Sequence, residues 1–154
     1  MQLRSKQVVK RIYGVLERQF RRYFEMAVRK QEETGNALLK ILESRLDNTV
    51  FRMGFASSRR QARQLVSHGH VMVNGRRVNK PSFNLRVGDV VEIKEKSRVV
   101  LPVKEAVEAA KERAAYPWLE VNYEDFKGTY LRYPAREEVE IPVDLQSIIE
   151  LYSK

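Results

Sequence analysis

The chain has 154 residues and a formal net charge of +9, with 29 lysines and arginines against 20 aspartates and glutamates, and it has no cysteine. A hydrophobic content of 43% is too high for a disordered chain, and the length allows one domain or two small ones. The lack of cysteine excludes disulfides, thiolate metal sites and cysteine nucleophiles, and the lack of a signal-like or membrane-spanning apolar run predicts a cytoplasmic protein with no membrane partner.

Residues 2–30 predict a helix in two pieces, because apolar residues recur at helical spacing and Gly14 interrupts them. The aromatic residues of this segment follow the same stripe, which favours core packing over a base-stacking platform. If the helix continues straight through Gly14, Arg4 joins a row of four other arginines, which fall within about 40° of one another on the opposite side at 100° per residue. They are Arg11, Arg18, Arg22 and Arg29. Either a neutralising partner or a solvated face relieved by Glu17 and Glu25 explains this row.

A loop is expected at residues 32–36, followed by a second amphipathic helix over residues 37–53 that Gly54 ends. Ser58 and Gln61 have the spacing of a capping box and predict a third helix that runs to about His68 and ends at Gly69.

The third helix is the most informative segment. Ala62, Leu65 and Val66 form its apolar stripe, and the opposite face carries Arg60, Arg63, Gln64 and Ser67, with Arg59 at the edge. Arg59 and Arg60 lie in the first turn, where the helix dipole disfavours cations by about 0.3–1 kcal/mol each. Because local rules are broken mainly at functional sites, we interpret this face as an anion-binding surface rather than a tolerated one.

A β-hairpin should follow, since residues 71–73 (Val-Met-Val) and 77–78 (Arg-Val) flank Asn74-Gly75, a strong type I′ turn signal. The turn would place Arg76 and Arg77 at or just past its tip. Further along the chain, the pattern predicts a strand at 90–94, a helix at 103–115, two strands around Gly128 within 119–133, and a short helix at 144–152.

The positive charge is concentrated in the first hundred residues. Residues 1–40 carry +6, residues 41–100 carry +7 and residues 101–154 carry −4. Arginine, whose planar fork suits phosphates, accounts for 18 of the 29 basic residues. A polyanion partner is therefore the leading hypothesis, and a soluble basic protein without a ligand is the alternative that composition leaves open.

A family resemblance becomes specific at residues 43–93, which read ESRLDNTVFRMGFASSRRQARQLVSHGHVMVNGRRVNKPSFNLRVGDVVEI. This run, together with the preceding YGVLERQFRRYFEMA and the final IELYSK, resembles the S-four family of small-subunit ribosomal proteins of bacterial type. The resemblance implies an α+β fold in which both chain ends form a helical domain (residues 1–43 and 135–154). Between them it implies an inserted RNA-binding domain (residues 44–134), with a helix pair packed on a small, mostly antiparallel sheet. Family members usually have a further N-terminal arm, which we expect this chain to lack.

What the resemblance implies for function is binding to small-subunit ribosomal RNA at a multi-helix junction of the 5′ domain, early in assembly. It also implies contact with the neighbouring ribosomal protein number five, an influence on decoding accuracy and, in some bacteria, repression of the protein's own mRNA. The free protein is expected to be a monomer. The implied RNA contacts are Arg11, Arg18, Arg22, Arg29, Ser58, Arg59, Arg60, Arg63, Gln64, Ser67, His70, Arg76, Arg77 and Lys80. The acidic residues Glu137, Glu138, Glu140 and Asp144 are candidates for the side that faces a protein partner.

Three competing interpretations are weaker. Arg45-Leu46-Asp47 matches part of the catalytic motif of pseudouridine synthases, but Ser44 replaces its glycine, and Asp47 is expected in the middle of a helix where a salt bridge is the commoner role. His68 and His70 provide too few ligands for a metal. A small stress factor of the same superfamily would share residues 57–78 but lack the flanking helices. We therefore expect no enzyme activity, no cofactor and no metal.

Overall fold

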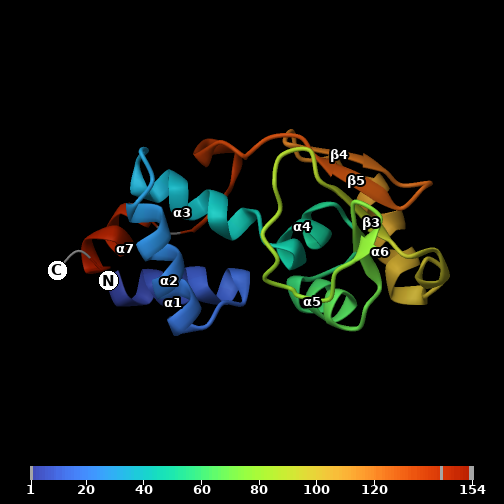
Figure 1. Ribbon diagram of the computed structural model, residues 1–154, viewed down its shortest axis with the longest axis horizontal. Coiled ribbons are helices and arrows are strands. Elements are labelled where there is room, and N and C mark those ends of the chain that lie inside the picture. Colours follow the sequence, from blue (N-terminus) through green and yellow to red (C-terminus); the bar gives the residue numbers. More distant parts are fainter. Residues whose placement is uncertain (1, 143, 153–154) are drawn as a thin grey trace. The chain divides into compact units, whose positions relative to one another are not determined.

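The computed structural model describes residues 2–142 and 144–152, and its chain divides into two compact units (Figure 1). The first unit (unit 1) combines the residues up to Glu43 with those from Pro134 onward, and the second (unit 2) is continuous from Ser44 to Tyr133. The boundaries expected from the sequence were residues 43 and 134. With seven α-helices and one five-stranded sheet in the described ranges, the protein has the predicted α+β fold class.

Unit 1 is helical. It contains α1 (Gln2–Tyr13), α2 (Glu17–Val28), α3 (Thr34–Glu43) and α7 (Leu145–Tyr152), with a short 3-10 helix at Arg136–Glu138. Helix α2 packs on α3, and α7 packs on both α1 and α3. The aromatic residues of α2 are buried as predicted, and Tyr152 of α7 stacks on Phe24 with ring centroids 4.8 Å apart. The two distant ends of the chain therefore share one core.

Two predictions for this region are wrong. Helix α3 begins at Thr34, inside the segment expected to be a loop. The single helix expected over residues 37–53 is two helices, α3 and α4 (Leu46–Arg52), because Arg45 has an extended backbone (ψ 139°). The backbone N–H groups of Leu46 and Asp47 donate to Phe83 O and Pro81 O instead of continuing the helix. These partners are distant in the sequence, so helical periodicity gave no sign of the break.

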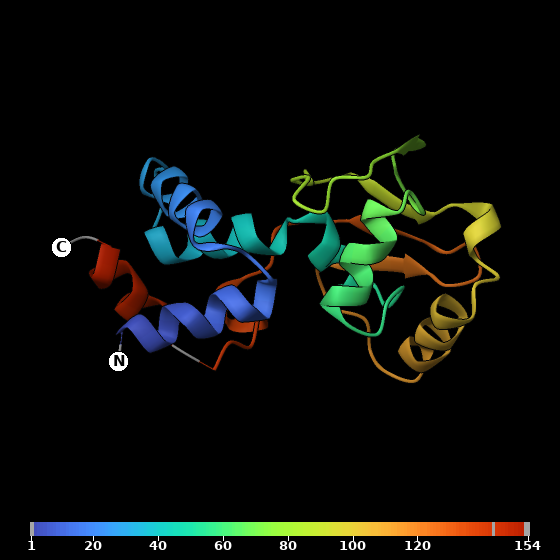
Figure 2. The same cartoon turned by 90° about the horizontal axis from the view of Figure 1, so that it is seen from below.

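Unit 2 has a sheet of five strands in the order β2-β1-β3-β5-β4, and every neighbouring pair is antiparallel. The strands are β1 (Val71–Val73), β2 (Arg76–Arg77), β3 (Val90–Ile93), β4 (Leu119–Asn122) and β5 (Lys127–Tyr130). Helices α4 and α5 (Arg59–Ser67) pack against each other, and Figure 2 shows them beside the sheet. Helix α6 (Leu101–Lys111) begins and ends a few residues earlier than predicted, and a short 3-10 helix spans Glu95–Ser97.

The core of unit 2 is closely packed around two glycines. A Cβ on Gly128 of β5 would lie 2.7 Å from Sδ of the buried Met53, so the sheet and the end of α4 approach as closely as they do only because this residue is glycine. A Cβ on Gly54 would lie 2.4 Å from Cβ of Ala110, which places α6 against the same end of α4. Trp118, for which the sequence made no prediction, is buried.

Within the described residues, no helix combines the length and the apolar character that crossing a bilayer requires.

Candidate nucleic-acid interface

Helix α5 begins at the predicted N-cap. Oγ of Ser58 accepts a hydrogen bond from the N–H of Gln61 at 3.0 Å. The reciprocal bond of a capping box is shifted by one residue, because Oε1 of Gln61 accepts from the N–H of Ser57 rather than that of Ser58. Both bonds satisfy N–H groups at the helix start, and they fix the direction in which the first turn points its side chains.

The polar face of α5 is exposed as predicted. Ala62, Leu65 and Val66 are buried, whereas the side facing solvent carries Arg60, Arg63, Gln64 and Ser67. Arg59 differs from these four residues. Its Nε donates to Oδ1 of Asn48 at 2.9 Å, and its guanidinium lies 4.8 Å from the ring centroid of Phe51. These contacts with α4 offset part of the dipole penalty that a cation meets in the first turn.

The hairpin has the predicted turn. Asn74 and Gly75 both have positive φ (51° and 82°), which is the type I′ pattern, and the register pairs Val73 with Arg76. The side chain of Asn74 braces this turn against the start of β3, since it donates to Asp89 Oδ1 at 2.9 Å and accepts from the N–H of Val90 at 2.9 Å. The tip therefore presents the exposed Arg76 and Arg77 from a fixed position.

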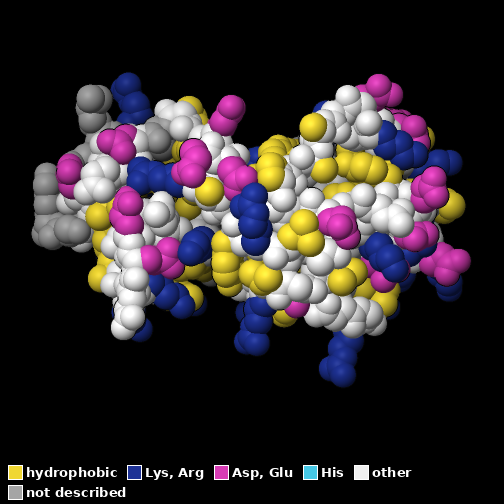
Figure 3. Space-filling model, turned by 90° about the horizontal axis from the view of Figure 1, so that it is seen from above, with side chains coloured by type: hydrophobic (Ala, Val, Ile, Leu, Met, Phe, Trp, Pro, Cys, Tyr) yellow, Lys and Arg dark blue, Asp and Glu magenta, His cyan; other side chains and the backbone are white. Residues whose placement is uncertain are grey.

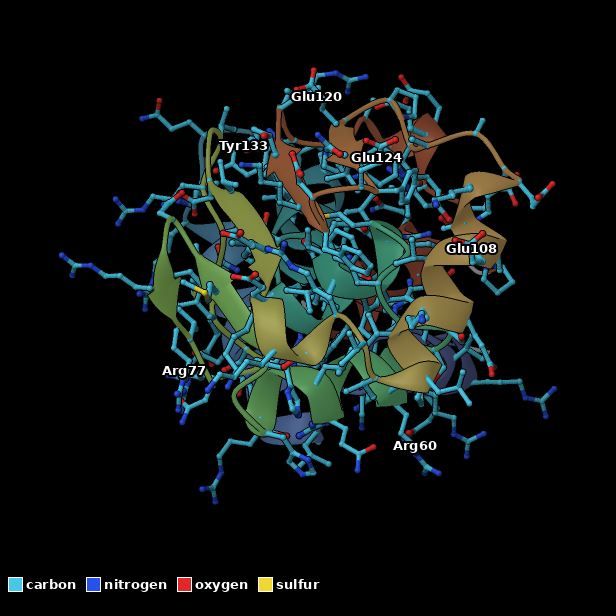
Figure 4. All side chains as sticks on the ribbon, turned by 90° about the vertical axis from the view of Figure 1, so that its right-hand side faces the viewer. Arg60, Arg77, Glu108, Glu120, Glu124 and Tyr133 are labelled. Atoms are coloured by element: carbon cyan, nitrogen blue, oxygen red, sulfur yellow. The ribbon has the colours of Figure 1, made fainter. Side chains whose placement is uncertain are left out.

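Two arginines of the α5 and hairpin surface lie away from three glutamates of unit 2. Figure 4 shows Arg60 and Arg77 on one side, and Glu108, Glu120 and Glu124 on the other. Among the residues that the structure describes, no carboxylate forms an ion pair with Arg60, Arg76, Arg77 or Lys80. The face in Figure 3, by contrast, carries acidic and basic side chains interspersed with hydrophobic ones. The surface formed by the exposed face of α5 and the β1–β2 hairpin, called the basic face below, is therefore suited to a polyanion.

The arginine row expected in unit 1 is only partly formed. Arg18 and Arg22 lie one turn apart on α2, and Arg29 is the C-cap of that helix. Arg11 lies on α1, and the backbone between the two helices leaves the helical path at Gly14 (φ 66°) and Leu16 (ψ 160°). The prediction that Arg11 belongs to the same row is therefore wrong, because the row required one straight helix. All four side chains are exposed.

Glu17, proposed as a neutraliser of that row, is engaged elsewhere. Its carboxylate accepts hydrogen bonds from Lys6 and from Tyr152 Oη, and Lys10 lies 3.9 Å away. Burial raises the pKa of Glu17, but these bonds and the charges of the two lysines outweigh burial and lower its pKa below the ordinary 4.5. Burial, followed by the hydrogen bond to Glu17, raises the pKa of Tyr152. The exposed arginines of α2 are left without this carboxylate as a partner.

The acidic residues near the C-terminus have different surroundings. Oε1 of Glu138 accepts from the N–H of Ala135 at 2.8 Å, and Oδ1 of Asp144 accepts from the N–H of Gln146 at the start of α7. Asp144 also lies 3.9 Å from a guanidinium nitrogen of Arg136. Glu137 and Glu140 are exposed. Two of the four carboxylates thus stabilise local backbone, and the other two face solvent.

Asp47 has a structural position. It lies in the first turn of α4, not in the middle of a helix as expected, and it is buried. Its two carboxylate oxygens accept from Nε and Nη2 of the equally buried Arg45 at 3.1 and 3.0 Å, and Oδ1 also accepts from the N–H of Asn48. A carboxylate bound in this way is not available to a substrate. Within the described residues, no three potential metal ligands of the His, Asp and Glu types lie together.

The structure gives His70 two partners that the sequence did not single out, Ser97 and Lys94. Nδ1 of His70 lies 2.6 Å from Oγ of the buried Ser97, and the N–H of Lys94 donates to His70 O. Lys94 follows β3, which pairs with β1, so it reaches His70 only through the sheet. The ring of His68 lies 6.5 Å from that of His70. The sequence of residues 90–94 predicted a strand, but it did not predict that this strand would pair with β1 and so bring Lys94 to His70.

Comparison with known proteins is consistent with this geometry. Residues 44–91 match the S4 domain family, and residues 1–43 match the family described as ribosomal protein S4/S9 N-terminal domain. The small ribosomal subunit protein uS4 of Kosmotoga olearia is 71% identical over the whole chain, which covers 74% of that relative. The uS4 proteins of Thermotoga maritima and Thermosipho africanus are 61% and 60% identical, also over 100% of this chain and 74% of each relative.

Proposed function

Because the chain belongs to the family of small ribosomal subunit protein uS4, we propose that it binds the RNA of the small ribosomal subunit through the basic face of unit 2. The family is one of structural ribosomal proteins and not of enzymes, and the place of such a protein is the ribosome in the cytoplasm.

The observation that carries the proposal is that Arg60 of α5 lies beside the braced hairpin with its exposed arginines, Arg76 and Arg77. Arg60 and the two hairpin arginines have no carboxylate partner among the described residues, so bound phosphates would neutralise them and release counterions. Arg63, Gln64 and Ser67 extend the same exposed face and supply further donors. Double-stranded RNA hides its base edges in a deep groove, so a rigid surface of this kind reads shape and backbone rather than sequence.

A finer part of the proposal concerns the RNA element. We infer a multi-helix junction in the 5′ domain, bound early in assembly, because such a junction offers phosphates from several directions and unit 1 carries a second set of exposed arginines. Arg18, Arg22 and Arg29 on α2, and Arg11 on α1, would contact the same RNA. Two basic surfaces on one protein favour the folded form of a junction over its open forms.

Protein contact is assigned to the acidic segment near the C-terminus. Glu137, Glu138, Glu140 and Asp144 are unsuited to RNA, and the family resemblance supports the neighbouring ribosomal protein number five as their partner. The same resemblance supports an influence on decoding accuracy and repression of the protein's own mRNA. We expect the free protein to be a monomer.

Binding to a 5′-domain junction RNA, measured beside an unrelated structured RNA of equal length at two salt concentrations, tests the proposal. We expect a preference for the junction that survives the higher salt. Equal binding to both RNAs that collapses with salt would leave only a non-specific basic surface and would contradict the proposal.

A variant pair separates the basic face from general charge. Arg60→Ala with Arg63→Ala removes two charges from α5, whereas the control Lys104→Ala with Arg113→Ala removes two exposed charges from α6 and the turn after it. The α5 variant should lose about tenfold or more in junction affinity, and the control should lose much less. Equal losses would show that the basic face has no special role.

A further inference from the structure

The turn that joins α5 to β1 gathers basic side chains around Gly69. This glycine has φ of 82°, and the side chain of Arg77 crosses it, since a Cβ on Gly69 would lie 3.4 Å from Cδ and 3.6 Å from Nη1 of Arg77. His68 and His70 flank the glycine, with ring centroids 6.5 Å apart. The guanidinium therefore lies beside the segment that carries both imidazoles of the chain.

His70 is held from the opposite side by the segment after β3. Its Nδ1 lies 2.6 Å from Oγ of Ser97, a residue that is 3% exposed, and its carbonyl oxygen accepts from the N–H of Lys94 at 2.9 Å. The hydrogen bond at Nδ1 fixes the orientation of the ring. Nε2 is then the nitrogen that remains for a ligand.

The electrostatic environment of His70 is positive. Burial lowers the pKa of His70 below its ordinary 6.5, and the charges of Lys94 and His68 lower it further. Among the described residues, no carboxylate pairs with Lys94 or Arg77, and Glu92 of the adjacent strand is already bound to Arg98 at 2.8 Å. In the described part of the chain, the basic groups around His70 therefore form no ion pair with a carboxylate.

We propose that His68, His70, Arg77 and Lys94 form a pocket for one backbone phosphate of the RNA, and that His70 takes up a proton from solvent when this phosphate binds. The inference rests on the proposed RNA-binding function. It adds to that function one phosphate-binding subsite and the uptake of one proton. Protonated His70 keeps its bond from Nδ1–H to Ser97 and donates from Nε2–H to a phosphate oxygen, while Arg77 and Lys94 neutralise the same group.

The sign of the pH dependence follows from proton linkage. If the complex holds one more proton than the free protein and RNA together, affinity rises as pH falls, by at most about one power of ten per pH unit. We expect junction RNA to bind about three to ten times more tightly at pH 5.5 than at pH 7.5, measured relative to a His70→Gln protein under the same conditions. The relative measurement removes the contribution of titrating groups that do not interact with His70.

The pocket can be tested without RNA. The chain has only two histidines, so the imidazole protons of each are readily followed by NMR during a pH titration. Replacing chloride by sulfate at equal ionic strength should raise the pKa of His70, because sulfate is a tetrahedral anion that does not titrate in this range. A pKa of His70 that is the same in both salts would overturn the pocket, whatever the protein does with RNA.

Lys94→Gln provides a second variant that leaves Ser97 and the backbone bond in place. Loss of the ammonium should raise the pKa of His70 in the free protein and reduce the further rise in this pKa caused by sulfate or RNA. A merely structural role of Lys94 would not give these two opposite changes.

RNA binding with no difference in pH dependence between the wild type and His70→Gln would overturn the proton uptake and leave the proposed function intact. Failure of the junction RNA to bind at either pH would instead contradict the proposed function, while the sulfate titration would still decide the pocket.

Discussion

Arg59 is anchored by Asn48: its Nε donates to the amide oxygen of Asn48 at 2.9 Å, although the two residues belong to different helices. The guanidinium also covers the ring of Phe51. Its neighbour Arg60 is exposed and forms no ion pair among the described residues. Two adjacent arginines at one helix start therefore have different roles, one in joining α4 to α5 and the other in facing the solvent.

Arg59→Ala and Arg60→Ala should accordingly separate stability from binding. Arg59→Ala should cost about 1 kcal/mol and lower Tm by about 2–4 °C, because it removes the bond to Asn48 and the contact with Phe51. Arg60→Ala should leave Tm equal or slightly higher, since a cation leaves the first turn, and should weaken RNA binding. Thermal melts and junction Kd values for the two variants decide this. A fall in Tm for Arg60→Ala as large as that for Arg59→Ala would contradict the division of roles.

The hairpin arginines should contribute phosphate contacts. Arg76→Ala and Arg77→Ala are each expected to reduce the slope of log K against log salt concentration by the amount that corresponds to about one lost phosphate contact. Tm should change little, because both side chains are exposed. The measurement is junction affinity at four or five salt concentrations. An unchanged slope for both variants would remove the hairpin from the interface.

Asp47 should matter for stability and not for chemistry. Asp47→Asn leaves the guanidinium of Arg45 buried without its carboxylate, which is expected to cost about 3 kcal/mol. Glu108→Gln, which breaks an exposed ion pair with Lys111, should cost less than about 0.5 kcal/mol and serves as the control. Denaturant unfolding of both variants gives the comparison. Equal small losses would mean that the Arg45–Asp47 pair contributes nothing beyond a surface bridge.

Glu17 should make unit 1 sensitive to acid. Its pKa is lower in the folded protein than the ordinary 4.5, so its contribution to stability is complete above about pH 4.5 and is lost as pH falls through the folded-state pKa. Glu17→Gln should lower Tm at pH 7 and make Tm depend less on pH below 4.5. The exposed Glu25 on the same helix provides the control Glu25→Gln. A parallel pH profile for the wild type and Glu17→Gln would show that the network with Lys6 and Tyr152 contributes no pH dependence.

A side chain at Gly128 should destabilise unit 2 while Met53 remains in place. Gly128→Ala is expected to cost about 1–3 kcal/mol through overpacking against Met53. Gly75→Ala, where nothing lies within 4 Å, should cost only the strain of a positive φ, about 1 kcal/mol. In a double-mutant cycle, Met53→Ala should absorb part of the Gly128→Ala penalty. Strict additivity of the two changes would place the clash elsewhere.

Elements with local signals were predictable from the sequence. The apolar spacing gave the burial of Phe20 and Phe24, the pair Ser58 and Gln61 gave the start of α5, and Asn74-Gly75 gave the hairpin turn. Each of these features depends on residues at most a few positions apart. Sequence reasoning works where the partner of a group lies in the same turn or the same stripe.

Elements fixed by distant partners were not predictable. The break before α4 exists because the loop that contains Pro81 and Phe83 accepts the N–H groups of Asp47 and Leu46. The same limit applied to the interface, where periodicity placed Arg59 at the edge of the polar face but did not show that Asn48 of another helix would bind it. Lys94 meets His70 through sheet pairing, for which the sequence has no local signal.

The discontinuity of unit 1 has a consequence for synthesis from the N-terminus. Helices α1 to α3 emerge before unit 2, but Tyr152, which stacks on Phe24, is made only after the whole of unit 2. Unit 2 is continuous and holds all of its own sheet partners, so it is able to fold while the helices of unit 1 still wait for α7. Every residue of the basic face is thus made before α7, so the stack of Tyr152 on Phe24 is among the last contacts of unit 1 that the order of synthesis allows.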